Sequence, residues 1–267
     1  VAGNYHDVLG AAGYIYTSTM TSDGATWYYA TDGLVHRILN GVDTTVNPRD
    51  ILPSTVSLSR VVALPNNGVA FSTTNYDNGW ANAGVYYITV DGVASYVASD
   101  STNCASYLVA YGTDSVVVSN WYGLTVINYV TGDVSYLPGL PQWSQNYAML
   151  VPSNDGYIYF VDRYDGTLLH RYDGATGDSA NYTDMRFTGM NWQGAAVING
   201  VLYNFDNPSW NVYILQGVNM SSGVATSMVN FANVIETPRI MGYTSDGSLA
   251  AATSYNLLTI TALPNLG

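Results

Sequence analysis

Aromatic side chains stand beside Asp and Asn at several separate points of this 267-residue chain. This combination can bind sugars, because the C–H face of a sugar packs on an aromatic ring and Asp or Asn side chains bind its hydroxyls. The same residue types also dominate the energetic centres of protein interfaces. We single out as a candidate binding face Tyr76, Asp77, Trp80, Trp121, Tyr122, Trp143, Tyr164, Asp165, Trp192 and Trp210.

A second set of residues could carry out catalysis on an acidic sugar. It consists of Arg49, Arg186 and Arg239 with Glu236, the only glutamate of the chain. Arginine binds carboxylates through two parallel hydrogen bonds, and Glu236 with an Asp of the binding face could form the acid/base pair of a glycosidase or lyase. Because no catalytic spacing can be recognised, we expect a protein without enzymatic activity.

The histidines and the single cysteine do not indicate a cofactor. The HxH, HExxH and CxxC patterns are absent, and His36 and His170, each followed by Arg, occupy equivalent places in two repeats. We therefore expect no transition metal and no cofactor, with Asp-rich residues 162–165 as a weak Ca²⁺ candidate. Asn181 and Asn219 begin N-glycosylation sequons.

The elements that must position these residues follow from a repeat. Short turns of the Asn-Gly or Asp-Gly type lie at Gly24, Gly68, Asp114, Gly156, Gly200 and Gly247, at spacings of 42 to 47 residues. Such turns favour antiparallel hairpins, and this period is typical of a four-stranded propeller blade. The sequence predicts an all-β, six-bladed β-propeller forming a single domain over residues 1–267. Its blades should cover residues 10–55, 56–101, 102–139, 140–185, 186–233 and 234–267.

The two ends of the repeat pattern complement each other. The sixth repeat offers three strands, while residues 1–9 form an unassigned segment of strand length. We expect this segment to complete the sixth blade and close the ring. The alternatives are a frayed terminus and pairing with a neighbouring molecule, which would link subunits into a filament.

Residues 156–177, GYIYFVDRYDGTLLHRYDGATG, and residues 126–132, VINYVTG, combine a hydrophobic strand with Asp-Gly and Thr-Gly endings. This pattern resembles the secreted propeller repeats of the NHL, YVTN and quinoprotein-like kinds, and it implies a propeller without specifying an activity. Residues 21–27, TSDGATW, are similar to the Asp-box turn of sialidase-like propellers, with Asp23 one residue closer to Trp27. We expect this turn to be structural.

Propeller topology predicts which residues share a face. The loops between the second and third strands of each blade and the links between blades should surround one mouth of the central channel. Five of the six Trp fall there: Trp80, Trp121, Trp143, Trp192 and Trp210. Their indoles could also simply fill the channel and pack adjacent blades together.

The amino-acid composition limits the kinds of partner that the protein can bind. The net charge is −12, and all seven basic residues are Arg. This balance argues against nucleic acid and anionic membranes, and the absence of a long apolar run argues against membrane insertion. A surface rich in Tyr, Asn, Ser and Thr suits the outside of a cell or virion. We therefore expect an extracellular structural or adhesive propeller that contacts copies of itself or another surface protein, with carbohydrate binding as the alternative.

Overall fold

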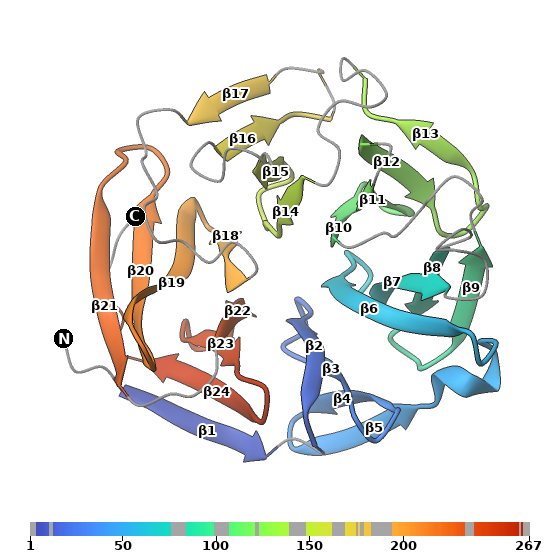
Figure 1. Cartoon of the computed structure of the whole chain (residues 1–267), viewed down its shortest axis with the longest axis horizontal. Helices are drawn as coiled ribbons and strands as arrows, with labels where there is room; N and C mark the ends of the chain where they lie inside the picture. The colour runs from blue at the N-terminus through green and yellow to red at the C-terminus, as the bar shows by residue number, and fades with distance from the viewer. Residues whose placement is uncertain are drawn as a thin grey trace.

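The chain folds into six four-stranded antiparallel sheets that form a ring, as Figure 1 shows. The computed structural model describes residues 4–10, 13–75, 84–98, 107–120, 123–138, 148–161, 169–174, 176, 179–182, 194–232, 238–261 and 263. The predicted all-β, six-bladed propeller is confirmed. Among the described residues, no helix is long and apolar enough to cross a membrane.

The first three sheets follow one another along the chain. The first holds β2 (Ile15–Met20), β3 (Thr26–Ala30), β4 (Val35–Leu39) and β5 (Val42–Val46). A short 3-10 helix, η1 (Pro48–Asp50), leads to β6 (Val56–Ala63), β7 (Val69–Asn75), β8 (Gly84–Ile88) and β9 (Ala94–Ala98). The third sheet holds β10 (Tyr107–Tyr111), β11 (Ser115–Asn120), β12 (Gly123–Asn128) and β13 (Val134–Tyr136).

The remaining sheets complete the ring. The fourth holds β14 (Met149–Val151), β15 (Ile158–Val161), β16 (Leu169–Tyr172) and β17 (Ser179–Tyr182). The fifth holds β18 (Ala196–Ile198), β19 (Val201–Ser209), β20 (Val212–Asn219) and β21 (Ala225–Ala232). The sixth combines β22 (Arg239–Tyr243), β23 (Leu249–Ala252) and β24 (Asn256–Thr261) with the N-terminal β1 (Asn4–Gly10).

The N-terminal strand closes the ring within the chain. β1 pairs antiparallel with β24 from Asn4 opposite Thr261 to Gly10 opposite Asn256, and the two strands lie side by side in Figure 1. The pairing covers the outer edge that β24 would otherwise expose. The prediction that this segment supplies the missing strand of the sixth blade is confirmed, and the frayed-terminus alternative is wrong.

Tight turns with a characteristic sequence explain why the repeat can be detected in the sequence. In the fifth sheet, Asn199 and Gly200 take φ angles of 52° and 77° between the paired residues Ile198 and Val201. Positive φ at both central positions defines the hairpin turn whose twist matches the flanking strands, and Asn-Gly adopts it at low cost.

The apolar core is divided among the junctions between blades. Each of six buried clusters joins two neighbouring sheets; for example, Trp27 and Val35 of the first sheet pack with Phe71 and Tyr86 of the second. Alternate side chains of a strand point to opposite sheet faces, so each blade contributes to two clusters. Burial therefore fixes the register of each blade against both neighbours.

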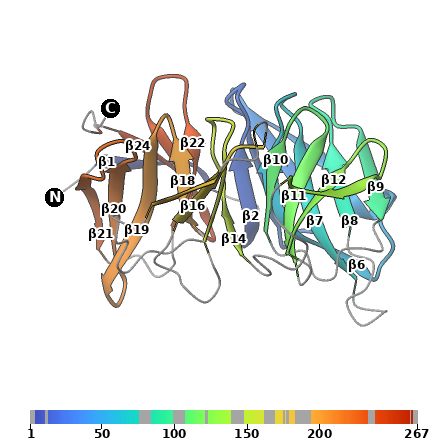
Figure 2. The same ribbon diagram turned by 90° about the horizontal axis from the view of Figure 1, so that it is seen from above.

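Turns alternate between the two faces of the ring because consecutive strands are antiparallel. We call the strands of each blade A to D from the centre outward, so the A strands are β2, β6, β10, β14, β18 and β22. The A–B face carries the A–B and C–D turns, and the B–C face carries the B–C turns and the links between blades. The long β19–β20 hairpin, a B–C turn, projects from the lower side in Figure 2.

Candidate functional site

Four neighbouring A strands bring Arg and Tyr side chains to one level of the ring, on the side of the B–C face. Tyr107 and Arg239 are the first residues of β10 and β22, and Tyr16 is the second residue of β2. Arg60 lies in the middle of the longer β6. These strands start at the B–C face, so the four residues lie along one side of the central axis, in the half of the ring toward that face.

Three of these strands depart from regular pairing at this level. Register shifts fall between Ile15 and Thr17 in β2, between Leu58 and Val61 in β6, and between Ile240 and Gly242 in β22. The backbone N–H of Val61 donates to Thr17 Oγ1 at 3.0 Å, which holds the irregular parts of β2 and β6 together. Such irregularities redirect side chains and are common beside functional sites.

The arginines contact the neighbouring strands directly. The Arg60 guanidinium carbon lies 4.2 Å from the centre of the Tyr107 ring, in a cation–π contact. Arg239 Nη1 donates to the backbone oxygen of Tyr16 at 3.2 Å. We call the following set the Arg–Tyr site: Tyr14, Tyr16, Arg60, Tyr107, Arg239 and Tyr255.

The electrostatics of the Arg–Tyr site are unfavourable for two cations. Burial lowers the pKa of the Arg239 guanidinium, and the positive charge of Arg60 lowers it further, while Tyr14 acts in the opposite direction. Among the described residues, no carboxylate forms an ion pair with Arg60 or with Arg239.

Three tyrosines extend the site to the surface. Tyr14 makes edge-on contacts with Tyr16 and with Tyr255, with ring centres 5.6 Å apart in both pairs. Their exposed fractions are 40% for Tyr14, 49% for Tyr16 and 54% for Tyr255. Edge-on packing leaves ring faces available to a ligand.

A cavity of about 920 Å³ occupies the centre of the ring, toward the A–B face. All six A strands or their turns line it, and the lining includes Val62, Val109 and Met241. These three residues lie two positions after Arg60, Tyr107 and Arg239 respectively, a distance of about 7 Å along a strand. The Arg–Tyr site therefore lies nearer the B–C face than the cavity does, and none of its residues lines the cavity.

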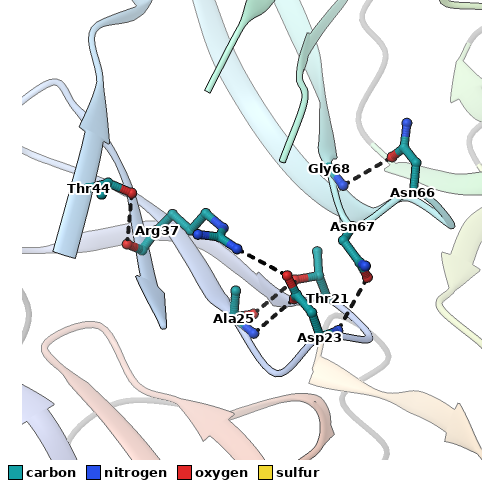
Figure 3. Close-up of polar contacts among 8 residues, drawn as sticks. All are labelled: Thr21, Asp23, Ala25, Arg37, Thr44, Asn66, Asn67 and Gly68. Carbon is teal, nitrogen blue, oxygen red and sulfur yellow. Dashed lines mark hydrogen bonds and ion pairs between the residues drawn. The ribbon is translucent and has the colours of Figure 1, made fainter. Parts of the chain in front are cut away.

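The rim of the cavity on the A–B face is built from self-contained turns. Asp23 Oδ1 accepts from Thr21 Oγ1 at 2.5 Å and from the Ala25 N–H at 3.1 Å, and Asp23 Oδ2 accepts from Arg37 Nη2 at 3.0 Å (Figure 3). The Asp23 N–H donates across the blade junction to Asn67 Oδ1 at 3.2 Å. Burial acts to raise the pKa of Asp23, but these hydrogen bonds and Arg37 outweigh it and hold the pKa below 3.8. Both carboxylate oxygens are already engaged, which fits the structural role expected for this turn.

The fourth and fifth blades are joined in the same way. Asn154 Nδ2 donates to Asn199 Oδ1 at 2.9 Å, and the Asn199 N–H donates to Asn154 Oδ1 at 2.8 Å. Both residues lie in A–B turns. These hydrogen bonds therefore link the A–B turns of neighbouring blades around the cavity.

The structure describes one member of the predicted binding face. Trp210 lies at the tip of the β19–β20 hairpin on the B–C face and is 88% exposed. The other members lie outside the described residues, and their grouping stays a prediction: Tyr76, Asp77, Trp80, Trp121, Tyr122, Trp143, Tyr164, Asp165 and Trp192.

The predicted catalytic set is only partly described. Arg49 lies in η1, is exposed and donates to the Pro53 carbonyl, while Arg239 belongs to the Arg–Tyr site. Glu236 and Arg186 lie outside the described residues, so an acid/base pair with these arginines stays a prediction.

The remaining predicted residues concern glycans and metals. Asn181 belongs to β17, and Asn219 ends β20 with its Oδ1 accepting from the Ser221 and Ser222 N–H groups. Their use as glycosylation sites stays a prediction. The weak Ca²⁺ candidate at residues 162–165 lies outside the described part of the chain. Within that part, no group of three or more His, Cys, Asp or Glu side chains could hold a metal ion.

Sequence reasoning missed Arg60. The residue stands in the apolar run VSLSRVVA of an inner strand, where a charged side chain is unusual. A charged residue within an apolar run was the feature of the sequence that could have identified Arg60. Arg239 was singled out from the sequence, but only the closed ring places β6 and β22 on either side of β2.

No protein-family model matches this sequence, and no curated protein matches it either. Solved structures match through the fold. PorZ, a surface component of the type-IX secretion system of Porphyromonas gingivalis, is 9% identical over 99% of this chain, with a TM-score of 0.57. The extracellular domain of BT3049 from B. thetaiotaomicron is 12% identical over 95% of this chain, with a TM-score of 0.52. This chain spans 40% of the length of each of these two structures.

A third structure has a different description. A Thermus thermophilus protein, described as a putative glucose dehydrogenase, is 12% identical, with a TM-score of 0.57 over 97% of this chain and 100% of its own. The same fold therefore occurs in surface components and in a protein described as an enzyme. The fold alone does not distinguish a binding role from an enzymatic one, so the function depends on the residues of the site.

Proposed function

We propose that this protein is an extracellular, non-enzymatic propeller that binds its partner through the Arg–Tyr site on the B–C face. The observation that carries the proposal is the contact chain Tyr255–Tyr14–Tyr16, which stays about half exposed beside Arg60 and Arg239. Tyrosines and arginines gathered at one place are the usual energetic centre of a binding surface. Two edge-on ring contacts also pre-organise the tyrosines, which reduces the entropy lost on binding.

The extracellular location is supported by two kinds of observation. PorZ is described as a bacterial surface component, and the BT3049 domain is described as extracellular. The present chain has no lysine, and its polar surface depends on Tyr, Asn, Ser and Thr. Short or rigid polar side chains lose little rotamer entropy in contacts, which suits a binding surface.

The first test is a binding screen on a glycan array that carries both neutral and acidic oligosaccharides. The parent should bind at least one class of glycan. The double variant Tyr14→Ser/Tyr255→Ser should weaken that binding by about 10-fold or more, because each lost stacking contact contributes about 0.5–1.5 kcal/mol. A matched control is Val42→Ser/Val93→Ser, which changes two residues that are each 62% exposed, Val42 at the start of β5 and Val93 in the β8–β9 turn, on the opposite face. Equal weakening by the control would contradict the assignment of the site.

A second candidate function is self-assembly through β1. This strand covers the outer edge of β24, and it comes from the opposite end of the chain. If β1 of one molecule paired with β24 of the next, the same backbone hydrogen bonds would link subunits into a filament.

Sedimentation velocity over a range of concentrations tests this candidate. Assembly by strand exchange predicts oligomers of the parent that dissociate when a peptide with the sequence of residues 1–10 is added in excess. A parent that stays monomeric at every concentration would remove self-assembly and leave the Arg–Tyr proposal untouched.

A further inference from the structure

Two exposed tyrosines meet where the ring of blades closes. Tyr14 immediately precedes β2 of the first blade, and Tyr255 lies in the turn between β23 and β24 of the sixth blade. Their ring centres are 5.6 Å apart and their planes meet at 87°, so the edge of one ring faces the other ring. This contact therefore spans the junction between the first and the last blade.

The backbone holds the two rings in place. The Ile15 N–H donates to the Ser254 carbonyl oxygen at 2.6 Å, which joins the two segments that carry the tyrosines. Thr31 fixes Tyr14 further, because its hydroxyl accepts from the Tyr14 N–H at 3.2 Å and its own N–H donates to the Tyr14 carbonyl oxygen at 3.0 Å. Groups that are already held in contact react with each other much faster than groups that must meet by diffusion.

Exposure separates this pair from most other tyrosine pairs. Tyr14 is 40% exposed and Tyr255 is 54% exposed, so an oxidant in solution can reach both residues. Within the described part of the chain, other pairs of tyrosine rings that do not involve Tyr14 each include a buried or partly buried member: Tyr29, Tyr129, Tyr159 or Tyr203.

Tyr16 is the competing partner of Tyr14. Its ring centre also lies 5.6 Å from that of Tyr14, and it is 49% exposed. Two further contacts hold Tyr16, since its ring packs on Tyr29 at 5.4 Å and its carbonyl oxygen accepts from Arg239. A bond between two rings must bring their centres closer than 5.6 Å. Tyr14 and Tyr255 lie in connecting segments, which adjust more easily than the residues of a strand.

The ring is closed by non-covalent contacts. β1 closes it by pairing with β24, and the 267 residues contain a single cysteine, so no disulfide can form within them. Proteins outside the cell commonly gain stability from covalent cross-links, which persist in oxidising surroundings. A bond between Tyr14 and Tyr255 would hold the first blade to the sixth even when β1 detaches.

We propose that Tyr14 and Tyr255 form an oxidative cross-linking site, at which a dityrosine bond closes the propeller covalently. This inference goes beyond the proposed binding function and does not depend on it.

The oxidant is hydrogen peroxide acting through a peroxidase. Each phenol loses one electron and one proton, and the two radicals form a C–C bond between the ring carbons next to the hydroxyl-bearing carbons. The hydrogen on each bonded carbon then moves to the oxygen of the same ring, which restores both phenols. The protein loses two hydrogen atoms in total, and one peroxide molecule takes them up to give two molecules of water.

Treatment of the full chain with a plant peroxidase and hydrogen peroxide tests the site. The protein is kept dilute, so that links between molecules are rare. Trypsin cleaves this lysine-free chain only after arginine, so Tyr14 lies in the peptide of residues 1–37 and Tyr255 in the peptide of residues 240–267. We expect dityrosine fluorescence from the monomer, and a linked pair of these two peptides whose mass is two hydrogen atoms below their sum.

The variants Tyr14→Phe and Tyr255→Phe identify the linked residues. Phenylalanine keeps the ring contact but has no phenol to oxidise, so each variant should lower the yield of the linked peptides by about 10-fold or more. The matched control Tyr136→Phe removes a tyrosine of β13 that is also 40% exposed, and it should leave the yield unchanged. The variant Tyr16→Phe should leave the yield unchanged as well.

The melting temperature provides a second readout. The link encloses most of the chain in one loop and so restricts the unfolded state. Oxidation should therefore raise the melting temperature of the parent by about 10 °C. Oxidised Tyr14→Phe should melt within about 2 °C of its untreated form.

The inference is overturned if dityrosine forms only between molecules or only within residues 1–37. A link between the two peptides that persists in both Phe variants would also overturn it, as would the absence of dityrosine under conditions that couple free tyrosine. Each of these results leaves the proposed binding function untouched. Failure to bind any array glycan would instead count against the proposed function and leave the cross-linking site in place.

Discussion

The Asp23 turn offers the sharpest quantitative prediction about stability. In the Asp23→Ala variant, the Ala25 N–H and the Arg37 guanidinium lose their acceptor, and the Thr21 hydroxyl keeps only the Ala25 carbonyl oxygen at 3.3 Å. The Asp23 and Arg37 side chains are 22% and 18% exposed, so water can replace the lost hydrogen bonds only in part. Hydrogen bonds to charged groups contribute about 1.5–3 kcal/mol each when buried, and partial exposure reduces that figure. We expect a loss of about 2–4 kcal/mol in the free energy of unfolding.

The Asp23→Asn variant separates the charge from the hydrogen bonds. The Asn oxygen can still accept from Thr21 and Ala25, whereas its amide nitrogen would face Arg37 without bonding it. We expect this variant to lose about 1 kcal/mol. Urea unfolding followed by tryptophan fluorescence at pH 7 measures both values. The reasoning is refuted if Asp23→Ala lies within about 0.5 kcal/mol of the parent, or if the Ala and Asn variants lose the same amount.

The pH dependence of the same variants tests the charge directly. Because the pKa of Asp23 is lower in the folded protein than its ordinary value of 3.8, the folded state holds the proton less tightly than the unfolded chain. The stabilisation is therefore complete above about pH 4 and is lost as the pH falls through the depressed pKa. The difference between the parent and Asp23→Ala should shrink between about pH 4 and pH 2. A difference that stays constant over this range would show that the charge of Asp23 contributes nothing.

Four further predictions concern the ring and its core. Deletion of residues 1–10, which removes β1, should cost about 6 kcal/mol, because the six residue pairs with β24 contribute about one backbone hydrogen bond each at roughly 1 kcal/mol; thermal melting measures the change. Gly68→Ala should cost about 1–3 kcal/mol, since a Cβ would lie 2.5 Å from the Ile88 carbonyl oxygen, and a stability equal to that of the parent would contradict this close approach. Phe205→Ala should cost about 3–5 kcal/mol in urea unfolding, because Phe205 is 1% exposed and its loss leaves a cavity. Burial raises the pKa of Tyr86 to about 12, so ultraviolet titration of Tyr86→Phe should show one tyrosine fewer that ionises well above pH 10 than the parent, and stability should fall as the pH rises through this range.

The sequence alone determined the architecture because the information is local and repeated. Asn199 and Gly200 adopt positive φ angles at a turn that short-range steric rules already favour, and equivalent turns recur about every 44 residues. Continuous apolar runs such as Val116–Val118 in β11 then required burial on both sheet faces, which a ring of blades provides. The surplus strand-length segment at the N-terminus and the missing fourth strand of the last repeat predicted closure of the ring, and the pairing of β1 with β24 confirms it.

The tertiary structure alone decided which distant side chains meet. Arg239 binds the backbone of Tyr16, 223 residues away in sequence, because β1 closes the ring and sets β22 beside β2. Arg60 joins them through a bulge in β6, and no local pattern predicts on which side of a strand a bulge will direct its residue. The turns depend on residues that are adjacent in sequence, so the sequence alone was enough to predict them. The Arg–Tyr site could not be predicted in this way, because its charges and rings come from four strands and two connecting segments whose proximity depends on closure of the whole ring.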